Sequence, residues 1–205
     1  MISGVKTREL ARRLVLALAL GLAVAAAPAW AAFDLAALMA LLAQQRGGEA
    51  EFTELRHVRG LDEPLASSGT LSFTAPDRFV RRTLKPRAET LAVEGNAVTM
   101  TRGGRSRSFA LDAAPEVGGL VEAIRGTLTG DAQTLQKHFR TELGGRAELW
   151  TLALVPKEPR LGAQLRAIRI DGRRGEVRSI ELQLVDGDRS VMTVEPLRPA
   201  SAAAP

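Results

Sequence analysis

The sequence predicts an α+β fold in which an incomplete antiparallel β-barrel of about ten or eleven strands is covered by helices. Two observations lead to this fold class. Most of the chain after residue 48 alternates apolar and other residues with a period of two, and turn residues interrupt the alternation at short intervals. One segment in the middle of the chain has a helical period instead, and its apolar side requires a partner surface.

Residues 1–31 have the pattern of a secretory signal peptide. Basic residues, among them Arg12 and Arg13, precede the apolar run 14–27, which is shorter than the ~20 residues of a spanning helix. The Ala-Trp-Ala of residues 29–31 then resembles a cleavage site. We expect export by a cleaved signal peptide, with an uncleaved anchor as the alternative.

The remaining chain reads as one domain, residues 32–197, followed by a flexible Ala/Pro/Ser-rich tail, residues 198–205. The 205 residues include no cysteine and two histidines, which excludes disulfides, thiolate metal sites and cysteine nucleophiles. The formal net charge is +5, but residues 1–31 contribute much of it, and the other charges alternate in sign. Because aromatic residues make up only 4% of the chain, we do not expect nucleic-acid binding. We expect the protein to be a monomer.

The first half of the domain is expected to begin with one helix and continue as strands. Strong helix formers fill residues 33–45, Asp34 stands near the start, and two glycines follow. In residues 65–74 Leu71 and Phe73 fall on one side of a strict alternation, which predicts a strand with one buried face. The other strands of this half are expected at 49–58, 78–84, 89–94, 97–102 and 106–111.

The second half opens with the helical segment. Apolar residues between 117 and 128 follow helical spacing, and the helix should end near Gly126 and lie against the concave face of the sheet. A short helix is expected at 131–139. Strands should resume at Arg140 and continue at 147–156, 166–171, 176–185 and 189–195, with 147–156 covered on both faces because both of its faces are apolar.

The chain offers little catalytic or metal-binding chemistry. His57 and His138 lack partners at ligand spacing, and the serines lack the glycine-flanked turn of hydrolases. The carboxylate pairs Asp62-Glu63 and Asp186/Asp188 fall in turns, where such residues are common for backbone reasons. No catalytic residue, metal or cofactor is therefore predicted.

What remains is the apolar inward face, which is either a filled core or a surface for acyl chains. Burying a methylene contributes ~0.8 kcal/mol, so an apolar groove can bind lipid without polar contacts. The candidate lipid-binding residues are Phe52, Leu71, Phe73, Phe79, Leu91, Val98, Met100, Phe109, Leu120, Ile124 and Trp150.

Several local motifs, in order, resemble the LolA family of periplasmic outer-membrane lipoprotein carriers over about residues 33–195. The resemblance rests on residues 51–54 (EFTE), 68–73 (SGTLSF), 75–79 (APDRF), Pro86 with 94–98 (EGNAV), and 150–156 (WTLALVP). It implies an incomplete antiparallel β-barrel lidded by helices over an apolar cavity, and a location in the periplasm of a Gram-negative-type envelope. It also implies a cargo of lipoprotein acyl chains or another amphiphile, and passage from an inner-membrane exporter to an outer-membrane acceptor.

Two departures indicate a divergent paralogue. Ala75 stands where the family has an arginine that supports hand-over to the receptor, and Arg81 stands where it has a tryptophan. Arg78 and Arg81 are the candidate rim residues for cargo transfer, although they belong to opposite faces of one strand.

Three functions are therefore weighed. The first is a non-enzymatic periplasmic carrier of lipoproteins or related lipids. The second is an envelope scaffold with a filled core, accessory to export of a glycolipid or aryl polyene lipid. The third, with least support from the residues, is a hydrolase or acyltransferase accessory with a hidden site.

Overall fold

The computed structural model describes residues 33–113 and 115–197, apart from the side chains of residues 115–117. The predicted signal peptide, 1–31, and the predicted tail, 198–205, lie outside these ranges. Within them, no helix combines the length and the apolar character that crossing a bilayer requires.

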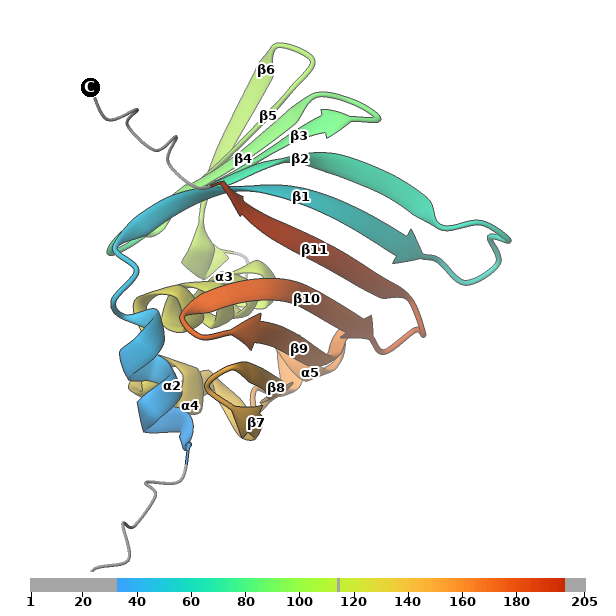
Figure 1. Cartoon of the computed structure of the whole chain (residues 1–205). Coiled ribbons are helices and arrows are strands. Elements are labelled where there is room, and N and C mark those ends of the chain that lie inside the picture. Colours follow the sequence, from blue (N-terminus) through green and yellow to red (C-terminus); the bar gives the residue numbers. More distant parts are fainter. Residues whose placement is uncertain (1–32, 114, 198–205) are drawn as a thin grey trace, which may run out of the picture. The chain divides into compact units, whose positions relative to one another are not determined.

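The strands form one open antiparallel sheet, which confirms the predicted fold class. The order of its eleven strands among the described residues is β6-β5-β4-β3-β2-β1-β11-β10-β9-β8-β7, so β6 and β7 are its two edges (Figure 1). The strands are β1 (Gly47–His57), β2 (Leu65–Thr74), β3 (Arg78–Lys85), β4 (Glu89–Glu94), β5 (Ala97–Arg102), β6 (Arg105–Ala110), β7 (Phe139–Arg146), β8 (Leu149–Pro156), β9 (Leu165–Arg173), β10 (Glu176–Leu184) and β11 (Arg189–Leu197).

One long-range pairing joins the two halves of the sheet. β1 pairs with β11 from Glu49 opposite Leu197 to His57 opposite Arg189. The other neighbours in the sheet are also neighbours in sequence, so each half is a meander of hairpins. The inner face therefore runs without interruption from β6 to β7.

The helices are α2 (Leu35–Leu42), the 3-10 turn η1 (Leu111–Ala113), α3 (Pro115–Thr129), α4 (Ala132–His138) and α5 (Pro159–Gly162). Asp34 caps α2, because its carboxylate accepts a hydrogen bond from the Ala37 amide at 2.8 Å. Asp131 caps α4 through the Thr134 amide at 3.0 Å. The expected helices thus form, α2 being shorter than 33–45 and α3 continuing past Gly126.

The main core lies between the helices and the inner face of β7–β10. Its buried side chains are Leu38, Met39, Leu42, Ala123, Leu135, Phe139, Trp150, Leu152, Leu154, Leu161, Leu165, Ile168 and Ile170. Close packing of helices and strands in this core depends on glycines, which have no side chain. A Cβ on Gly126 would lie 2.9 Å from Leu135 Cγ, and a Cβ on Gly172 would lie 2.1 Å from the Trp150 ring. This half of the sheet is therefore tightly covered.

Two details differ from the expectations. β8 is buried on one face only, since Trp150, Leu152 and Leu154 are buried while Leu149 on the other face is 68% exposed. The reason is that the helices pack on the inner face of the sheet alone. The short helix α5 was not expected, and its buried Leu161 fits against Gly119 of α3.

Candidate functional site

The inner face of β1–β6 is the candidate site, because it continues the helix-covered face with less cover. The strand register places Phe52 opposite Gly69 of β2 and Val194 of β11. It then places Phe73 opposite Phe79 of β3. All of these residues lie on the side of the sheet where the helices pack. We call this surface, from β1 to β6, the N-terminal inner face.

Two small buried clusters interrupt this face. The first consists of Ala50, Phe52, Leu71 and Val194, and the second of Val93, Val98 and Leu111. Phe79 is half-buried and packs against both clusters, so it is the apolar link between them. The buried patches are small compared with the core over β7–β10, and the side chains between them keep part of their surface free.

The helix α3 connects the two halves, as the sequence predicts for the amphipathic middle segment. Leu120 packs on the main core, while Val121 packs on the cluster around Val98. Arg125 donates a hydrogen bond to the Gly95 carbonyl in the β4–β5 turn at 2.7 Å and pairs with Glu122 at 2.5 Å. The cover that α3 gives to the N-terminal inner face is therefore centred on β4 and β5.

Exposure of the apolar residues increases toward the free end of β4 and β5. Val93 lies opposite Val98, and both are buried, at 2% and 0% exposure. Two residues further along, Leu91 lies opposite Met100, and Met100 is 39% exposed. The next pair on this face is the ion pair Glu89–Arg102 at 3.8 Å. The face thus changes from buried to open to charged along two strands.

A polar network lies on the same face, centred on Glu54. Its carboxylate accepts hydrogen bonds from Arg81, from Ser67 and from Ser190. The Arg81 guanidinium also lies 4.7 Å from the centre of the Phe52 ring, which is within cation–π range. The side chains of Arg81 and Glu54 are 27% and 14% exposed, so solvent still reaches the pair.

This network determines the charge state of Glu54. Burial raises the pKa of the Glu54 carboxyl, but the Ser190 hydrogen bond, the charge and hydrogen bond of Arg81 and the Ser67 hydrogen bond lower it more. The resulting pKa lies below the ordinary value. Glu54 is therefore charged at neutral pH, and its charge is balanced by Arg81.

The structure brings most of the candidate lipid-binding residues together and separates three. Those on the N-terminal inner face are Phe52, Leu71, Phe73, Phe79, Leu91, Val98, Met100 and Phe109. Trp150 is instead 1% exposed in the main core and donates a hydrogen bond from Nε1 to the Arg174 carbonyl at 2.8 Å. Leu120 packs on the same core, and Ile124 is half-buried on α3. Arg78 is exposed on the outer face, opposite in orientation to Arg81.

Sequence reasoning missed the acidic partner in the network. Glu54 is 27 residues from Arg81 and 136 from Ser190, so no local spacing indicates the contacts. One signal was available: Arg81 and Arg82 are adjacent in a strand, so one of the two must point to the inner face.

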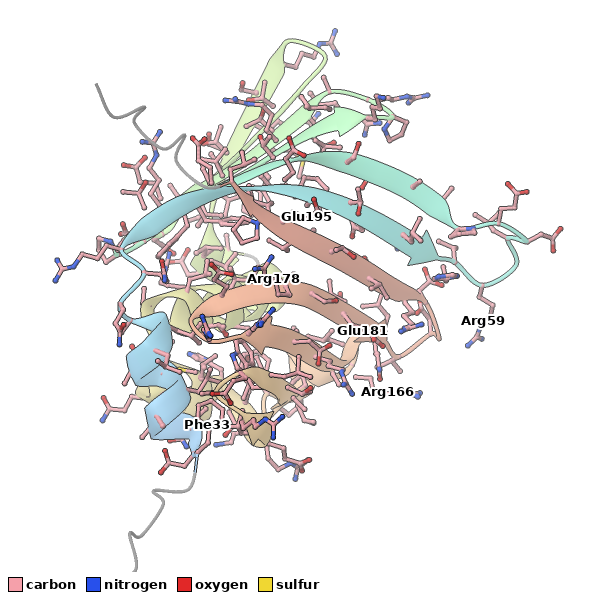
Figure 2. All side chains as sticks on the ribbon, viewed as in Figure 1. Phe33, Arg59, Arg166, Arg178, Glu181 and Glu195 are labelled. Carbon is pink, nitrogen blue, oxygen red and sulfur yellow. The ribbon has the colours of Figure 1, made fainter. Side chains whose placement is uncertain are left out.

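The outer face of the sheet is polar by comparison. On β10 and β11 Arg189 makes two hydrogen bonds to Glu181, at 2.7 and 2.8 Å. Hydrogen bonding by Arg189 is the main reason why the pKa of Glu181 is lowered to about 2. Figure 2 shows charged side chains spread over these strands, including Arg178, Glu181 and Glu195. Such a surface suits solvent rather than acyl chains.

Three of the clefts in the described part of the chain have no Phe79 in their lining. One of about 340 Å³ lies on the outer face between Glu51, Leu84 and Glu195. One of about 280 Å³ lies beside α3 and includes Arg125 and His138. The third, about 580 Å³, lies at the ends of β3–β6. The apolar cavity expected from the sequence therefore stays a prediction, and the apolar surface at hand is the half-covered inner face.

Comparison with solved structures finds similar chains at low identity. A LolA superfamily protein from Nitrosomonas europaea matches with a TM-score of 0.44 and 8% identity over 82% of this chain and 95% of the other. A DUF1329 family protein from Desulfovibrio piger matches with a TM-score of 0.47 and 11% identity over 83% of this chain and 92% of the other. A chain of the Pseudomonas aeruginosa MucA/MucB complex matches with a TM-score of 0.41 and 13% identity over 82% of this chain and 59% of the other. No curated protein matches the sequence.

The sequence itself carries the assignment. The family model described as "Outer membrane lipoprotein carrier protein LolA-like" matches residues 25–204, which is nearly the whole chain. The open eleven-stranded antiparallel sheet with helices on one face is the architecture that the sequence resemblance implied. Members of the family are binding and carrier proteins. The chain therefore belongs to the LolA-like outer-membrane lipoprotein carrier family.

Proposed function

We propose that this protein is a periplasmic carrier that binds the acyl chains of lipoproteins or related lipids on its N-terminal inner face and ferries them toward the outer membrane. The observation that supports this most is a group of apolar side chains that keep part of their surface free on that face. This group, which we call the acyl platform, consists of Phe73, Phe79, Leu91, Met100 and Phe109.

The energy available from such a surface is sufficient for lipid. Each buried methylene contributes ~0.8 kcal/mol, so a 16-carbon chain has a gross limit of about 12 kcal/mol. Association and ordering cost several kcal/mol of this, and an open face removes less water than a closed pocket. A net affinity near the micromolar range, about −8 kcal/mol, follows for a well-covered chain.

Cargo transfer needs a donor and an acceptor. We propose an inner-membrane exporter and an outer-membrane acceptor, with the carrier acting as a monomer. Ala75 in place of the family arginine implies that hand-over uses other contacts. Arg81 is not free to replace it, because it is held by Glu54 and lies over Phe52.

A scaffold with a filled core is the second candidate, and one observation favours it. Phe52 and Val98 are already buried by the protein's own side chains, at 2% and 0% exposure. If the acyl platform closes in the same way in solution, the face has no room for an alkyl chain. The protein would then act through its surface.

The carrier proposal is tested by uptake and stability of paired variants. Delipidated wild type is titrated with a fluorescent fatty acid and, separately, with a triacylated peptide. Phe79→Glu should reduce uptake at least tenfold while shifting the melting midpoint by only a few degrees. The matched control is Val80→Glu, because Val80 is the next residue, is also half-buried, and points to the outer face.

Each outcome decides between the two candidates. Uptake by wild type and by Val80→Glu, together with its loss in Phe79→Glu, supports the carrier. Absence of uptake by wild type, or equal loss of uptake and stability in Phe79→Glu, supports the filled core. Preference for the triacylated peptide over the fatty acid identifies lipoproteins as the cargo class.

A further inference from the structure

One end of the sheet carries a concentration of positive charge that the acyl platform does not use. Six exposed basic residues gather where β3 ends and β4 begins and where β5 turns into β6. This group, which we call the basic end, consists of Arg82, Lys85, Arg87, Arg102, Arg105 and Arg107.

The sheet register brings these residues to one end of the sheet, with Arg82 on its outer face and Arg102, Arg105 and Arg107 on its inner face. Thr83 pairs with Glu89 across β3 and β4, and Glu89 pairs with Arg102 across β4 and β5. Arg102 in turn pairs with Arg105 across the β5–β6 turn. Figure 1 shows the β3–β4 and β5–β6 connections at the same end of the sheet. The third cleft, of about 580 Å³, opens between these connections and is lined by Arg82, Arg87 and Arg102.

The positive charge is not neutralised within the protein. Between residues 79 and 110 the acidic residues are Glu89 and Glu94. Glu94 lies at the other end of β4, opposite Arg78, and Glu89 faces Arg102 at 3.8 Å. Within the described residues, the other five members of the basic end take part in no ion pair and no side-chain hydrogen bond. Their field is therefore available to an outside anion.

Protection of an edge strand explains only part of this arrangement. β6 is an edge, and charged residues such as Arg105 and Arg107 on an edge strand discourage pairing with another chain. Arg82 and Arg87, however, belong to an interior strand and the loop after it. Leu84 is 55% exposed on the outer face and Met100 is 39% exposed on the inner face, each beside basic residues of this end, and apolar exposure does not help to keep chains apart.

The basic end also adjoins the acyl platform. On the inner face of β5 the residues run from Arg102 to Met100 to Val98, which is from charged to half-open to buried. An anionic amphiphile has the same order, from headgroup to upper chain to chain end. The basic end is thus placed at the entrance to the surface that the proposed function assigns to acyl chains.

We propose that the basic end is a docking surface for an anionic phospholipid bilayer. The arginines and Lys85 attract the headgroups, and Leu84 and Met100 enter the interface beside them. Each basic residue near an anionic membrane surface strengthens binding about fivefold, so six such residues give strong but salt-sensitive association. Docking in this orientation presents the open end of the acyl platform to the membrane. The proposal extends the carrier function, but its test does not depend on cargo binding.

The test is vesicle binding by the protein as the cell produces it, together with two variants of equal charge change. The docking variant is Arg82→Gln/Arg87→Gln/Arg105→Gln/Arg107→Gln. The control variant is Arg140→Gln/Arg160→Gln/Arg166→Gln/Arg173→Gln, whose four arginines are exposed elsewhere and make no ion pair within the described residues. Flotation is measured with phosphatidylethanolamine vesicles containing phosphatidylglycerol and with phosphatidylcholine vesicles, at low and high salt.

We expect wild type and the control variant to bind the anionic vesicles with similar affinity, and the docking variant to bind at least tenfold more weakly. Binding should fall steeply at high salt, and phosphatidylcholine vesicles should bind little. Equal losses in the two variants would assign binding to net charge alone and overturn the proposal. No loss in either variant, or equal binding to phosphatidylcholine, would also overturn it, because residues outside the basic end would then make the contact.

Fatty-acid uptake by the docking variant separates this proposal from the carrier function. Retained uptake with lost vesicle binding supports a docking surface distinct from the acyl platform. Retained vesicle binding by a wild type that takes up no fatty acid would leave the docking surface in place and remove the carrier function. Equal melting midpoints of the two variants are the control for folding.

Discussion

Replacing Arg81 by methionine should destabilise the protein at neutral pH, because Glu54 would lose its only charged partner in the network. The carboxylate would keep the Ser67 and Ser190 hydroxyls but remain 86% shielded by protein, since the Glu54 side chain is 14% exposed. Removing one partner of a fully buried ion pair costs about 3–5 kcal/mol. Because Arg81 is 27% exposed, we expect a smaller loss, about 2–3 kcal/mol, or about 5–10 °C in melting midpoint.

The loss should depend on pH with a definite sign. In wild type the pKa of Glu54 is lowered, so its contribution to stability is present above the ordinary pKa and is lost as the pH falls through the folded value. In Arg81→Met burial is no longer offset by a cation, so the pKa of Glu54 rises. The difference between the two proteins should therefore be greatest near pH 7 and shrink in acid, where Glu54 is protonated in both.

Urea unfolding at pH 7 and at successively lower pH measures this difference. Arg78→Met is the matched control, because Arg78 is on the same strand, is exposed, and faces away from the network. The double variant Glu54→Gln/Arg81→Met should recover most of the lost stability, since it leaves no uncompensated charge. An equal cost for Arg78→Met, or a cost for Arg81→Met that does not change with pH, would refute the reasoning.

Three further changes test other parts of the structure. Gly172→Ala should cost about 3 kcal/mol or prevent folding, because the new methyl would lie 2.1 Å from the Trp150 ring; a normal melting midpoint would contradict this. Leu135→Ala should cost about 2–5 kcal/mol while leaving fatty-acid uptake per folded molecule unchanged, because Leu135 is fully buried in the helix-covered half; reduced uptake would show that the two halves act together. Glu181→Gln should cost less than about 1 kcal/mol of stability at pH 7, since Arg189 is 51% exposed. This cost should shrink as the pH falls toward about 2, the pKa of Glu181, because wild type then loses the ion pair as well; urea midpoints at pH 7 and pH 3 measure the change.

The strands of the first half could be predicted from the sequence because their signals are local. The hairpin 89–94/97–102 and the strand 65–74 form within the predicted bounds, since alternation fixes the strand and Gly95-Asn96 fixes the turn. Alternation also groups Phe73, Phe79 and Phe109 on one face. The site as a whole could not be predicted in this way, because the period of two does not tell how much of the face the helices cover.

Trp150 illustrates that missing information. The alternation of its strand places Trp150 on the inner face, just as the alternation of β3 places Phe79 there. What separates them is the sheet order, which places β8 under the helices and β3 beyond them. That order depends on the β1–β11 pairing between distant parts of the chain, and no local pattern indicates it. The Glu54 network could not be predicted for the same reason. Its residues come from β1, β2, β3 and β11, and β11 lies beside β1 only through that long-range pairing.

The uneven cover of a single face connects stability with the proposed function. Over β7–β10 the inner face is filled by the helices, so this half can keep the protein folded without help from a ligand. Around β3–β5 the same face keeps Arg81 at 27% and Met100 at 39% exposure. Side chains in a filled core do not retain such exposure, and an ion pair with both partners enclosed would cost more in desolvation than apolar residues at the same positions. The ion pair beside the acyl platform is therefore better understood as part of a surface that water reaches when cargo is absent, and from which an acyl chain can displace that water.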